Sequence, residues 1–377
     1  MLNERDVTID ILKALGIILI VVGHSGFLYS DFLTLFHVAV FFIASGYCTN
    51  LEKYSINNRE LYKYVVKKIK GYWLPFFLFN FVMTLLHNYL LNINVYTDNP
   101  EFLIICEDTS LNVLLDKYSI GDILIRFVKL LFFCGESRMG GATWFLRTLF
   151  IVSIIVVFYC YFIRLLRIKF LSLMLWVLGV VSLFVGWLCQ IKEINLKLGF
   201  NSVLISLIAF IFGYSLGELN RKSKISVPIS VYVCMFIISF IFLIVIDIVI
   251  GDDSIAIATG YIINPFVYIV ASILGWILLY SLSIILSRIE IIKNVLVYIG
   301  NRTIIILLFH FLAFKLVILV EIIIKKLPMV LLASFPVLER YGNSCWWVVY
   351  SVTGVILPLL ISYFGEKIVN LIRKLSL

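Results

Sequence analysis

Residues 9–48 decide the fold, and they read IDILKALGIILIVVGHSGFLYSDFLTLFHVAVFFIASGYC. Two apolar runs flank a short polar turn at Ser30 and Asp31. A helix needs about 20 apolar residues to cross a bilayer, and the first run meets that length. Acidic residues such as Glu4 and Asp6 precede it, whereas a cleaved secretory signal would begin with a basic region without acids. The stretch therefore predicts a hairpin of two retained membrane helices.

The rest of the chain continues this pattern. Of its 377 residues, 62% are apolar and 14% are charged, and its mean hydropathy is +1.08. A soluble domain carries about 25% charged residues, so a soluble enzyme, a coiled coil and a disordered chain are all excluded. The sequence shows no internal repeat and no linker rich in Pro or Ser. The composition therefore predicts an all-α polytopic membrane protein that forms a single domain over residues 1–377.

The criterion of about 20 apolar residues predicts about ten membrane spans. They cover residues 9–29, 32–48, 72–93, 143–162, 170–190, 198–217, 226–250, 261–285, 303–324 and 345–363. An outer insertion at residues 94–142 separates the third span from the fourth.

Basic residues indicate the direction of these spans. Lys and Arg gather in the segment 49–70, in the turns after the fourth, sixth and eighth spans, and in the C-terminal tail, whereas the loop 94–122 is acidic. Loops rich in Lys and Arg stay in the cytoplasm, so we expect both termini to be cytoplasmic. The same bias explains the net charge of +9. Membrane lipid is therefore the expected partner, and nucleic acid is not.

The cysteines and histidines differ in what they indicate. The seven Cys lie far apart without a CxxC motif, so neither a disulfide framework nor a structural metal is expected. All four His, at positions 24, 37, 87 and 310, fall inside proposed spans. An ionisable side chain in a span is costly and indicates function. For any single one of them, the alternative is a buried imidazole bonded to a neighbouring carbonyl group.

Two of these histidines are expected at the same depth in the membrane. His24 lies six residues before Ser30, and His37 lies six residues after Asp31. In an antiparallel hairpin, both would lie about 9 Å below the outer surface. They would be the catalytic acid–base residues of an active site in the outer third of the membrane.

Further side chains are expected to reach that depth. Arg147, near the start of the fourth span, would be a third catalytic residue that stabilises an oxyanion. Trp144 and His87 would contact the substrate there. Zinc is a competing interpretation of clustered histidines, but no HxxxH pair or suitably spaced carboxylate accompanies them, so no metal is expected.

A second set of polar residues is expected at the cytoplasmic side. Lys13 and His310 lie in the inner halves of their spans, and Lys67, Lys70 and Arg302 lie at the inner surface. Together they would bind a phosphate-bearing cosubstrate. The alternative is that topology alone places Lys and Arg at inner helix ends.

Asp10 is expected to have a structural role. It precedes His24 by 14 residues on one helix, which is about 21 Å along the axis. The two side chains therefore cannot form a dyad. Asp10 would pair with a base near the inner surface, namely Arg5, Lys13 or Lys70.

The N-terminal motifs resemble the acyltransferase-3 family of integral-membrane O-acyltransferases, and within it the fucose 4-O-acetylase-like branch. The resemblance rests on RDVTIDILKALGIILIVVGHSG and LFHVAVFFIASGYC, and on the weaker segments KKIKGYWLP, TWFLRTLF and GNRTIIILLFH. Matching positions include Arg5, Asp10, Lys13, His24, His37 and Ser45, and of these Arg5, Asp10 and Ser45 would support the site. Ala39 replaces a frequent Pro, Thr303 replaces a Ser, and Lys67, Lys68 and Lys70 replace an Arg-rich helix start.

The resemblance implies a reaction and its cosubstrate. An acetyl or other short acyl group would pass from acetyl-CoA to a carbohydrate hydroxyl on the envelope side of a bacterial plasma membrane. His24 would be the general base, either by direct transfer or through an acyl-His intermediate. The CoA phosphates would lie near the cationic residues of the inner side.

Two other functions remain compatible with polar residues in spans. One is a carrier or flippase for a lipid-linked sugar, which would use such residues equally well, although no inverted repeat is present. The other is a sensory membrane protein that retains the fold without chemistry. Transfer of labelled acetyl groups would separate the enzyme from both.

Overall fold

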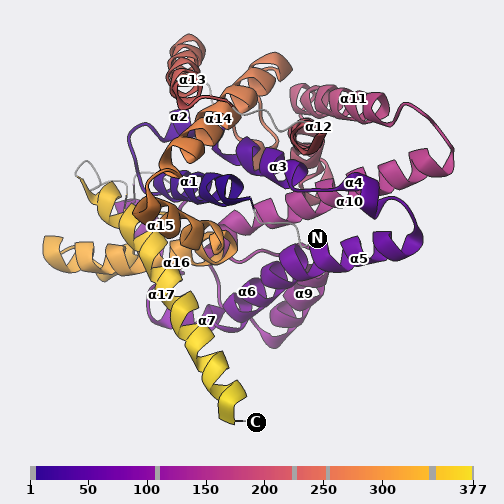
Figure 1. Ribbon diagram of the computed structural model, residues 1–377. Helices are drawn as coiled ribbons and strands as arrows, with labels where there is room; N and C mark the ends of the chain where they lie inside the picture. The colour runs from indigo at the N-terminus through magenta and orange to yellow at the C-terminus, as the bar shows by residue number, and fades with distance from the viewer. Residues whose placement is uncertain (1–5, 107–110, 223–226, 252–254, 339–344, 376–377) are drawn as a thin grey trace. The chain divides into compact units, whose positions relative to one another are not determined.

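The computed structural model describes residues 6–106, 111–222, 227–251, 255–338 and 345–375 (Figure 1). This part of the chain consists of helices and loops, and its only β feature is an isolated bridge between Ala256 and Tyr261. The expected all-α fold is confirmed. The chain divides into two compact units. Unit 1 contains residues up to 16, 31–76 and 144–300, and unit 2 contains residues 17–30, 77–143 and 301 onward. Each unit is considered by itself, and the expected single domain stays a prediction.

Eight helices in the described part of the chain are long and apolar enough to cross a membrane. They cover Ser30–Tyr47, Arg138–Leu165, Leu171–Ile191, Lys197–Lys222, Ile229–Ile250, Pro265–Leu286, Thr303–Lys325 and Trp346–Val369. The first expected span is α1 (Val7–Gly23), which has 17 residues. The third is divided into α6 (Leu74–Leu85) and α7 (His87–Asn92). A multi-pass membrane protein is thus confirmed, whereas the count of ten and the sidedness of the termini stay predictions.

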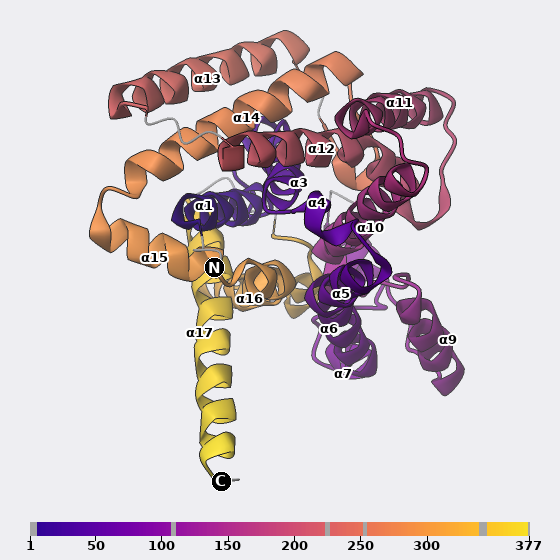
Figure 2. The same cartoon turned by 45° about the vertical axis from the view of Figure 1, so that its right-hand side comes forward.

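Unit 1 is a bundle built around α3 and α12. Its elements are the first part of α1, α2 (Ser30–Thr34), α3 (His37–Tyr47), α4 (Leu51–Tyr54), α5 (Asn58–Lys68), the π-helix η1 (Ile69–Trp73), α10 (Trp144–Leu165), α11 (Leu171–Ile191), η3 (Lys197–Gly199), α12 (Phe200–Lys222), α13 (Ile229–Ile250), η4 (Ile257–Thr259), α14 (Pro265–Leu286) and α15 (Glu290–Gly300). Helices α13 and α14 lie side by side (Figure 2). Most of the buried side chains of these helices are apolar, so apolar packing dominates the bundle.

Glycines allow α3 and α12 to approach closely. A Cβ atom on Gly213 would lie 1.9 Å from the Ile43 carbonyl oxygen, and one on Gly46 would lie 1.9 Å from the Phe210 carbonyl oxygen. Gly213 and Gly217 form a GxxxG pattern on α12. Small residues at this spacing are typical of close helix pairs in membranes, where van der Waals contact replaces hydrophobic driving force.

Unit 2 is organised by the pair of α16 (Thr303–Lys325) and α17 (Trp346–Leu375), which pack against each other. Its other elements are the second part of α1, α6, α7, α8 (Glu101–Ile105), α9 (Ile120–Leu131), η2 (Arg138–Thr143) and η5 (Met329–Ala333). Buried polar groups join the long pair. Glu321 of α16 is fully buried, accepts a hydrogen bond from the Tyr350 hydroxyl at 2.8 Å, and forms an ion pair with Lys325.

The outer insertion folds onto α6 through one buried amide. The Asn80 side chain accepts hydrogen bonds from the backbone N–H and hydroxyl of Ser137, both at 2.9 Å, and donates to the Thr143 hydroxyl at 3.1 Å. A Cβ on Gly140 would lie 2.1 Å from the Asn80 oxygen. The Gly-rich stretch before α10 therefore allows a close backbone approach.

Candidate functional site

Two histidines form a hydrogen-bonded pair in unit 2. His24 lies in the turn after α1, and Nδ1 of its ring is 3.1 Å from Nε2 of His310 on α16. The two rings are nearly parallel, at an angle of 9°. His310 is fully buried, whereas His24 is half-buried. The pair thus joins a buried imidazole to one that is partly exposed.

The backbone of α16 decides which nitrogen atoms carry protons. Nδ1 of His310 lies 3.1 Å from the Ile306 carbonyl oxygen and 2.9 Å from that of Leu307. Carbonyl oxygens only accept, so Nδ1 of His310 carries the proton and its Nε2 presents a lone pair. Nδ1 of His24 must then donate to that lone pair. In the neutral pair, Nε2 of His24 is therefore the basic nitrogen.

Aromatic rings enclose the pair. The Phe311 ring lies 5.0 Å from that of His24 and 4.0 Å from that of His310, measured between ring centroids. Phe314 packs edge-on against His310, and Phe335 packs on Phe311 at 4.6 Å. These apolar neighbours limit the access of water and strengthen the electrostatic interactions of the imidazoles.

The position of His310 differs from the expectation. Counting residues from the start of its span placed His310 in the inner half of the membrane, apart from His24. The structure instead brings the two rings together. The count was misleading because it assumes straight helices normal to the membrane and does not reveal which faces meet. The binding of a cosubstrate by His310 stays a prediction.

The other two expected catalytic residues belong to unit 1. His37 is the first residue of α3, is buried, and contacts the Leu33 carbonyl oxygen through Nδ1. Arg147 is half-buried on α10, and its guanidinium packs against the turn before α12, where a Cβ on Gly199 would lie 3.2 Å from Nη2. The convergence of both residues with His24 stays a prediction.

The expected substrate-binding residues, Trp144 and His87, differ in their surroundings. Trp144 opens α10, is half-buried and meets the Phe145 ring edge-on. His87 opens α7 and faces the outer insertion, where its Nε2 lies 2.9 Å from the Asp116 carbonyl oxygen. Its ring stacks on Tyr118 at 3.4 Å. These contacts give His87 a structural role in unit 2, and its contact with a substrate stays a prediction.

Cationic residues of unit 1 gather near the N-terminal part of α1 and the end of α5. Lys13 forms an ion pair with the buried Asp10 at 3.4 Å. Lys13 is one of the three partners expected for Asp10. Lys67 and Lys70 are exposed, whereas Lys68 between them is buried. Arg5, another partner expected for Asp10, lies outside the described residues.

Lys68 is held by two tyrosines. Its ammonium lies 5.1 Å above the Tyr64 ring and 4.8 Å above the Tyr72 ring, and it donates to the Tyr72 hydroxyl at 3.3 Å. Burial opposes the charged form, but the two tyrosines outweigh it and raise the pKa of Lys68. A π-helix, η1, follows directly, and π-helical turns occur frequently at functional sites. The sequence predicted Lys67 and Lys70 as binding residues, and Lys68 was not among them.

Ser45 lies on α3, and its backbone carbonyl oxygen accepts a hydrogen bond from the Thr49 hydroxyl at 2.7 Å. It is half-buried on α3. This contact concerns the main chain of Ser45, so the supporting role expected of its side chain stays a prediction.

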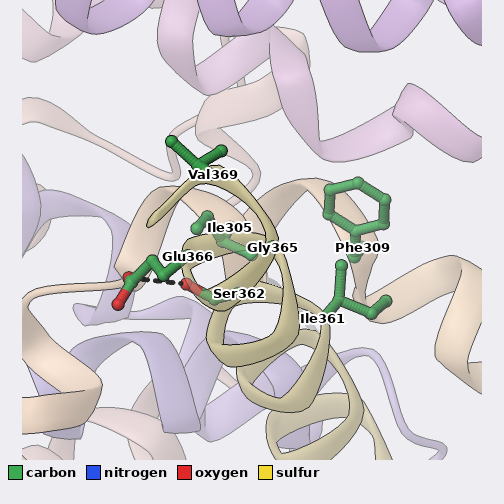
Figure 3. A pocket seen from close by; sticks show the side chains of 7 residues that line it. All are labelled: Ile305, Phe309, Ile361, Ser362, Gly365, Glu366 and Val369. Carbon is green, nitrogen blue, oxygen red and sulfur yellow. Dashed lines mark hydrogen bonds between the residues drawn. The ribbon is translucent and has the colours of Figure 1, made fainter. Parts of the chain in front are cut away.

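Arg302 is engaged by a carboxylate of unit 2. Its Nη2 lies 2.9 and 3.0 Å from the two carboxylate oxygens of Glu366 on α17. A pocket of about 620 Å³ lies beside this ion pair. It is lined by Ile305, Phe309, Ile361, Ser362, Gly365, Glu366 and Val369 (Figure 3). The Ser362 hydroxyl donates to Glu366 at 3.3 Å within it. An incoming phosphate would have to compete with Glu366 for Arg302.

Comparison with known proteins identifies one family. The family model described as an acyltransferase domain, acyltransferase-3, matches residues 6–363. None of the curated proteins and none of the solved structures compared with the chain matches it.

Proposed function

The chain belongs to the acyltransferase-3 family, and from this premise we propose that it transfers an acetyl or other short acyl group from an acyl-CoA to a carbohydrate hydroxyl. That it is a multi-pass membrane acyltransferase follows from the family and from its apolar helices. The donor, the acceptor and the bacterial plasma membrane as its location are parts of the proposal. The acceptor would be an envelope or exported polysaccharide, or a lipid-linked sugar.

The observation that carries the proposal is the hydrogen bond from His24 to His310. It supports a general base at Nε2 of His24. This nitrogen would take the proton of the acceptor hydroxyl while the hydroxyl oxygen attacks the thioester carbonyl carbon. The carbon–sulfur bond then breaks, and the CoA sulfur leaves with the proton returned by the His24 imidazolium. The products are an O-acyl ester and CoA.

His310 would orient His24 and stabilise its charged form. While His24 is protonated, its Nδ1–H continues to donate to the lone pair of His310. The carbonyl oxygens of Ile306 and Leu307 keep the His310 proton at Nδ1. The arrangement is analogous to a nucleophile–base–orienter series in which the third group fixes the tautomer of the base. Here the orienting group is neutral.

In unit 1, the proposed catalytic residues are Arg147 and His37. Arg147 would stabilise the negative charge that develops on the thioester oxygen. His37 would assist proton transfer. Trp144 would stack on a sugar ring, since indole rings offer a large apolar face. Substitution of each residue tests these roles independently of the role of His24.

The proposed binding site for the CoA phosphates is the cationic group of unit 1. This group comprises the expected residues Lys13, Lys67 and Lys70, together with the buried Lys68. A buried ammonium restrained by two aromatic rings loses little side-chain entropy when it binds an anion. Arg302 of unit 2 would contribute only after release from Glu366.

The function is tested with the purified protein in detergent. It is incubated with acetyl-CoA labelled in the acetyl group and with candidate sugars and polysaccharides. Labelled O-acetyl ester, with equimolar release of CoA, is the expected product. His24→Gln protein serves as the matched control. Neither a carrier nor a sensor would consume acetyl-CoA, so an unaltered protein that forms no ester with any acceptor and releases no CoA would contradict the proposal.

A further inference from the structure

A buried lysine of unit 2 has no part in the proposed chemistry. Lys315 lies on α16, four residues after Phe311, so both side chains lie on one face of the helix. It is 5% exposed. Its ammonium donates to the Leu332 carbonyl oxygen at 2.8 Å and to that of Ser334 at 2.6 Å. A lysine in an apolar span is costly, so its presence there indicates a role.

Both acceptors belong to residues 331–338, which we call the capping segment and which comprise the end of η5 and the irregular chain after it. All its side chains are buried except the partly exposed Phe335. Backbone carbonyls outside helices, and those in the last turn of a helix, need other partners when water is excluded. Lys315 supplies two of those partners, and it thereby ties the capping segment to α16.

The capping segment reaches the histidine pair through two phenyl rings. Phe335 follows Ser334 directly and packs on Phe311 at 4.6 Å. Phe311 in turn contacts both His24 and His310. The Lys315 ammonium and the His24 ring are therefore joined by one peptide unit and two ring contacts.

Phe335 is restrained from its other side by the outer insertion. Its backbone N–H donates to the Asn112 side chain at 2.9 Å. The Arg138 guanidinium lies 4.9 Å from the centre of its ring. Phe335 is thus restrained by the outer insertion directly and by Lys315 through the Ser334 carbonyl group.

We propose that Lys315 is a positioning residue for the pair of His24 and His310. Because α16 carries both His310 and Lys315, the two lysine hydrogen bonds fix the capping segment relative to His310. Phe335 then keeps Phe311 against both imidazoles, which preserves the ring orientation of His24 and excludes water. Displacements of about 1 Å at a reacting group can lower a rate by about 100-fold. The catalytic consequence rests on the proposed function, whereas the structural link does not.

The structural link is tested without any substrate. Protein labelled with ¹⁵N-histidine is prepared as the unaltered chain, as Lys315→Met and as Lys326→Met, an exposed lysine of unit 2 that serves as the matched control. Nitrogen chemical shifts distinguish the two tautomers of a neutral imidazole. We expect His24 and His310 to show Nδ1–H tautomers in the unaltered and Lys326→Met proteins. In Lys315→Met, the His24 signals should average between tautomers. Unchanged His24 and His310 signals in folded Lys315→Met would overturn the inference.

A second variant covers the case in which Lys315→Met does not fold. Phe335→Leu removes the ring contact to Phe311 but leaves both lysine hydrogen bonds. It should show the same averaging of the His24 signals, and an unchanged spectrum here would also overturn the inference. Since this readout needs no acyl transfer, it fails or succeeds separately from the proposed function.

Kinetics then connect the position to the reaction. Lys315→Met should lower kcat at least 10-fold, with the KM for acetyl-CoA changed less than about twofold. Combined with Phe335→Leu, it should lower kcat little further, because both changes act through one contact. A merely structural lysine predicts an unchanged kcat per folded molecule, and additive losses in the double variant.

Discussion

Nδ1 of His24 lies 3.1 Å from Nε2 of His310, although 286 residues separate them in the chain. The donor and the acceptor of this hydrogen bond are assigned, because the carbonyl oxygens of α16 hold the His310 proton at Nδ1. His24 therefore donates within the pair, and its Nε2 is the basic nitrogen. This asymmetry assigns different consequences to substitution of the two histidines.

For His24, loss of the basic nitrogen should abolish transfer. His24→Gln retains a hydrogen-bond donor for His310 but cannot accept a proton near neutral pH. General-base catalysis contributes about 10²–10⁴-fold, so kcat should fall by that factor. Binding of acetyl-CoA, measured by calorimetry, and the thermal unfolding midpoint should change little. Transfer at the unaltered rate by folded His24→Gln would refute the general-base role.

For His310, we expect a smaller and selective loss. His310→Asn retains polarity but removes the ring lone pair that orients His24. The rate constant kcat should fall about 10- to 100-fold, less than for His24→Gln, because the base itself remains. If His310 instead binds the cosubstrate, as its position in the span first indicated, the affinity for acetyl-CoA should fall while kcat at saturation stays the same. Calorimetry beside steady-state kinetics separates the two results.

For Lys68, a loss of cosubstrate affinity is expected. Lys68→Met removes the buried ammonium between Tyr64 and Tyr72 but keeps the length of the side chain. The Kd for acetyl-CoA should rise about 10-fold, in keeping with about 1.4 kcal/mol for one charge-assisted contact. Lys222→Met is the control, since Lys222 is an exposed lysine of unit 1 paired with Glu218. Equal affinities of both variants and the unaltered protein would exclude Lys68 from the binding site.

The all-α membrane fold was accessible from sequence, whereas the role predicted for His24 stays a prediction. Apolar runs of span length can only be helices in a bilayer, so fold class follows from composition. An imidazole inside such a run is costly, and this rule indicated all four histidines, His24 among them. The pairing of His24 with His310 was not accessible, because it depends on which faces of α1 and α16 meet. Residue counts along a span give no information about helix rotation.

Two further residues were missed although the sequence contains their signals. Tyr64, Lys68 and Tyr72 are spaced four residues apart, which places all three on one helical face. That pattern distinguishes Lys68 from its neighbours in a run of lysines. Lys315 lies in the middle of an apolar span, where the rule applied to the histidines applies equally. Neither signal identifies the partner, which requires the packed structure.

Close packing of α3 against α12 predicts a specific sensitivity to side-chain volume. Gly213→Ala would bring a Cβ to 1.9 Å from the Ile43 carbonyl oxygen, so the helices must separate. Overpacking of this kind destabilises by about 1–3 kcal/mol. Gly365→Ala is the control, because no heavy atom outside its own helix lies within 4 Å of its Cβ. Replacement of this helical glycine should be neutral or stabilising by up to about 1 kcal/mol. Thermal unfolding in detergent gives both values, and equal midpoints would argue against the close contact.

The last prediction concerns the side of the membrane on which each loop lies. Lysines and arginines of the segment 49–70 are expected in the cytoplasm, and the acidic loop 94–122 is expected outside. In a functional variant without native cysteines, Lys67→Cys should react with a membrane-impermeant maleimide only after cells are permeabilised. Glu101→Cys, on the exposed side of α8, should react in intact cells. Sidedness matters for the mechanism, because acyl-CoA is a cytoplasmic metabolite and its phosphates are expected near Lys68. Labelling of Lys67→Cys in intact cells would place the cationic group of unit 1 outside, and the proposed CoA site would then have to be abandoned even if acyl transfer itself were demonstrated.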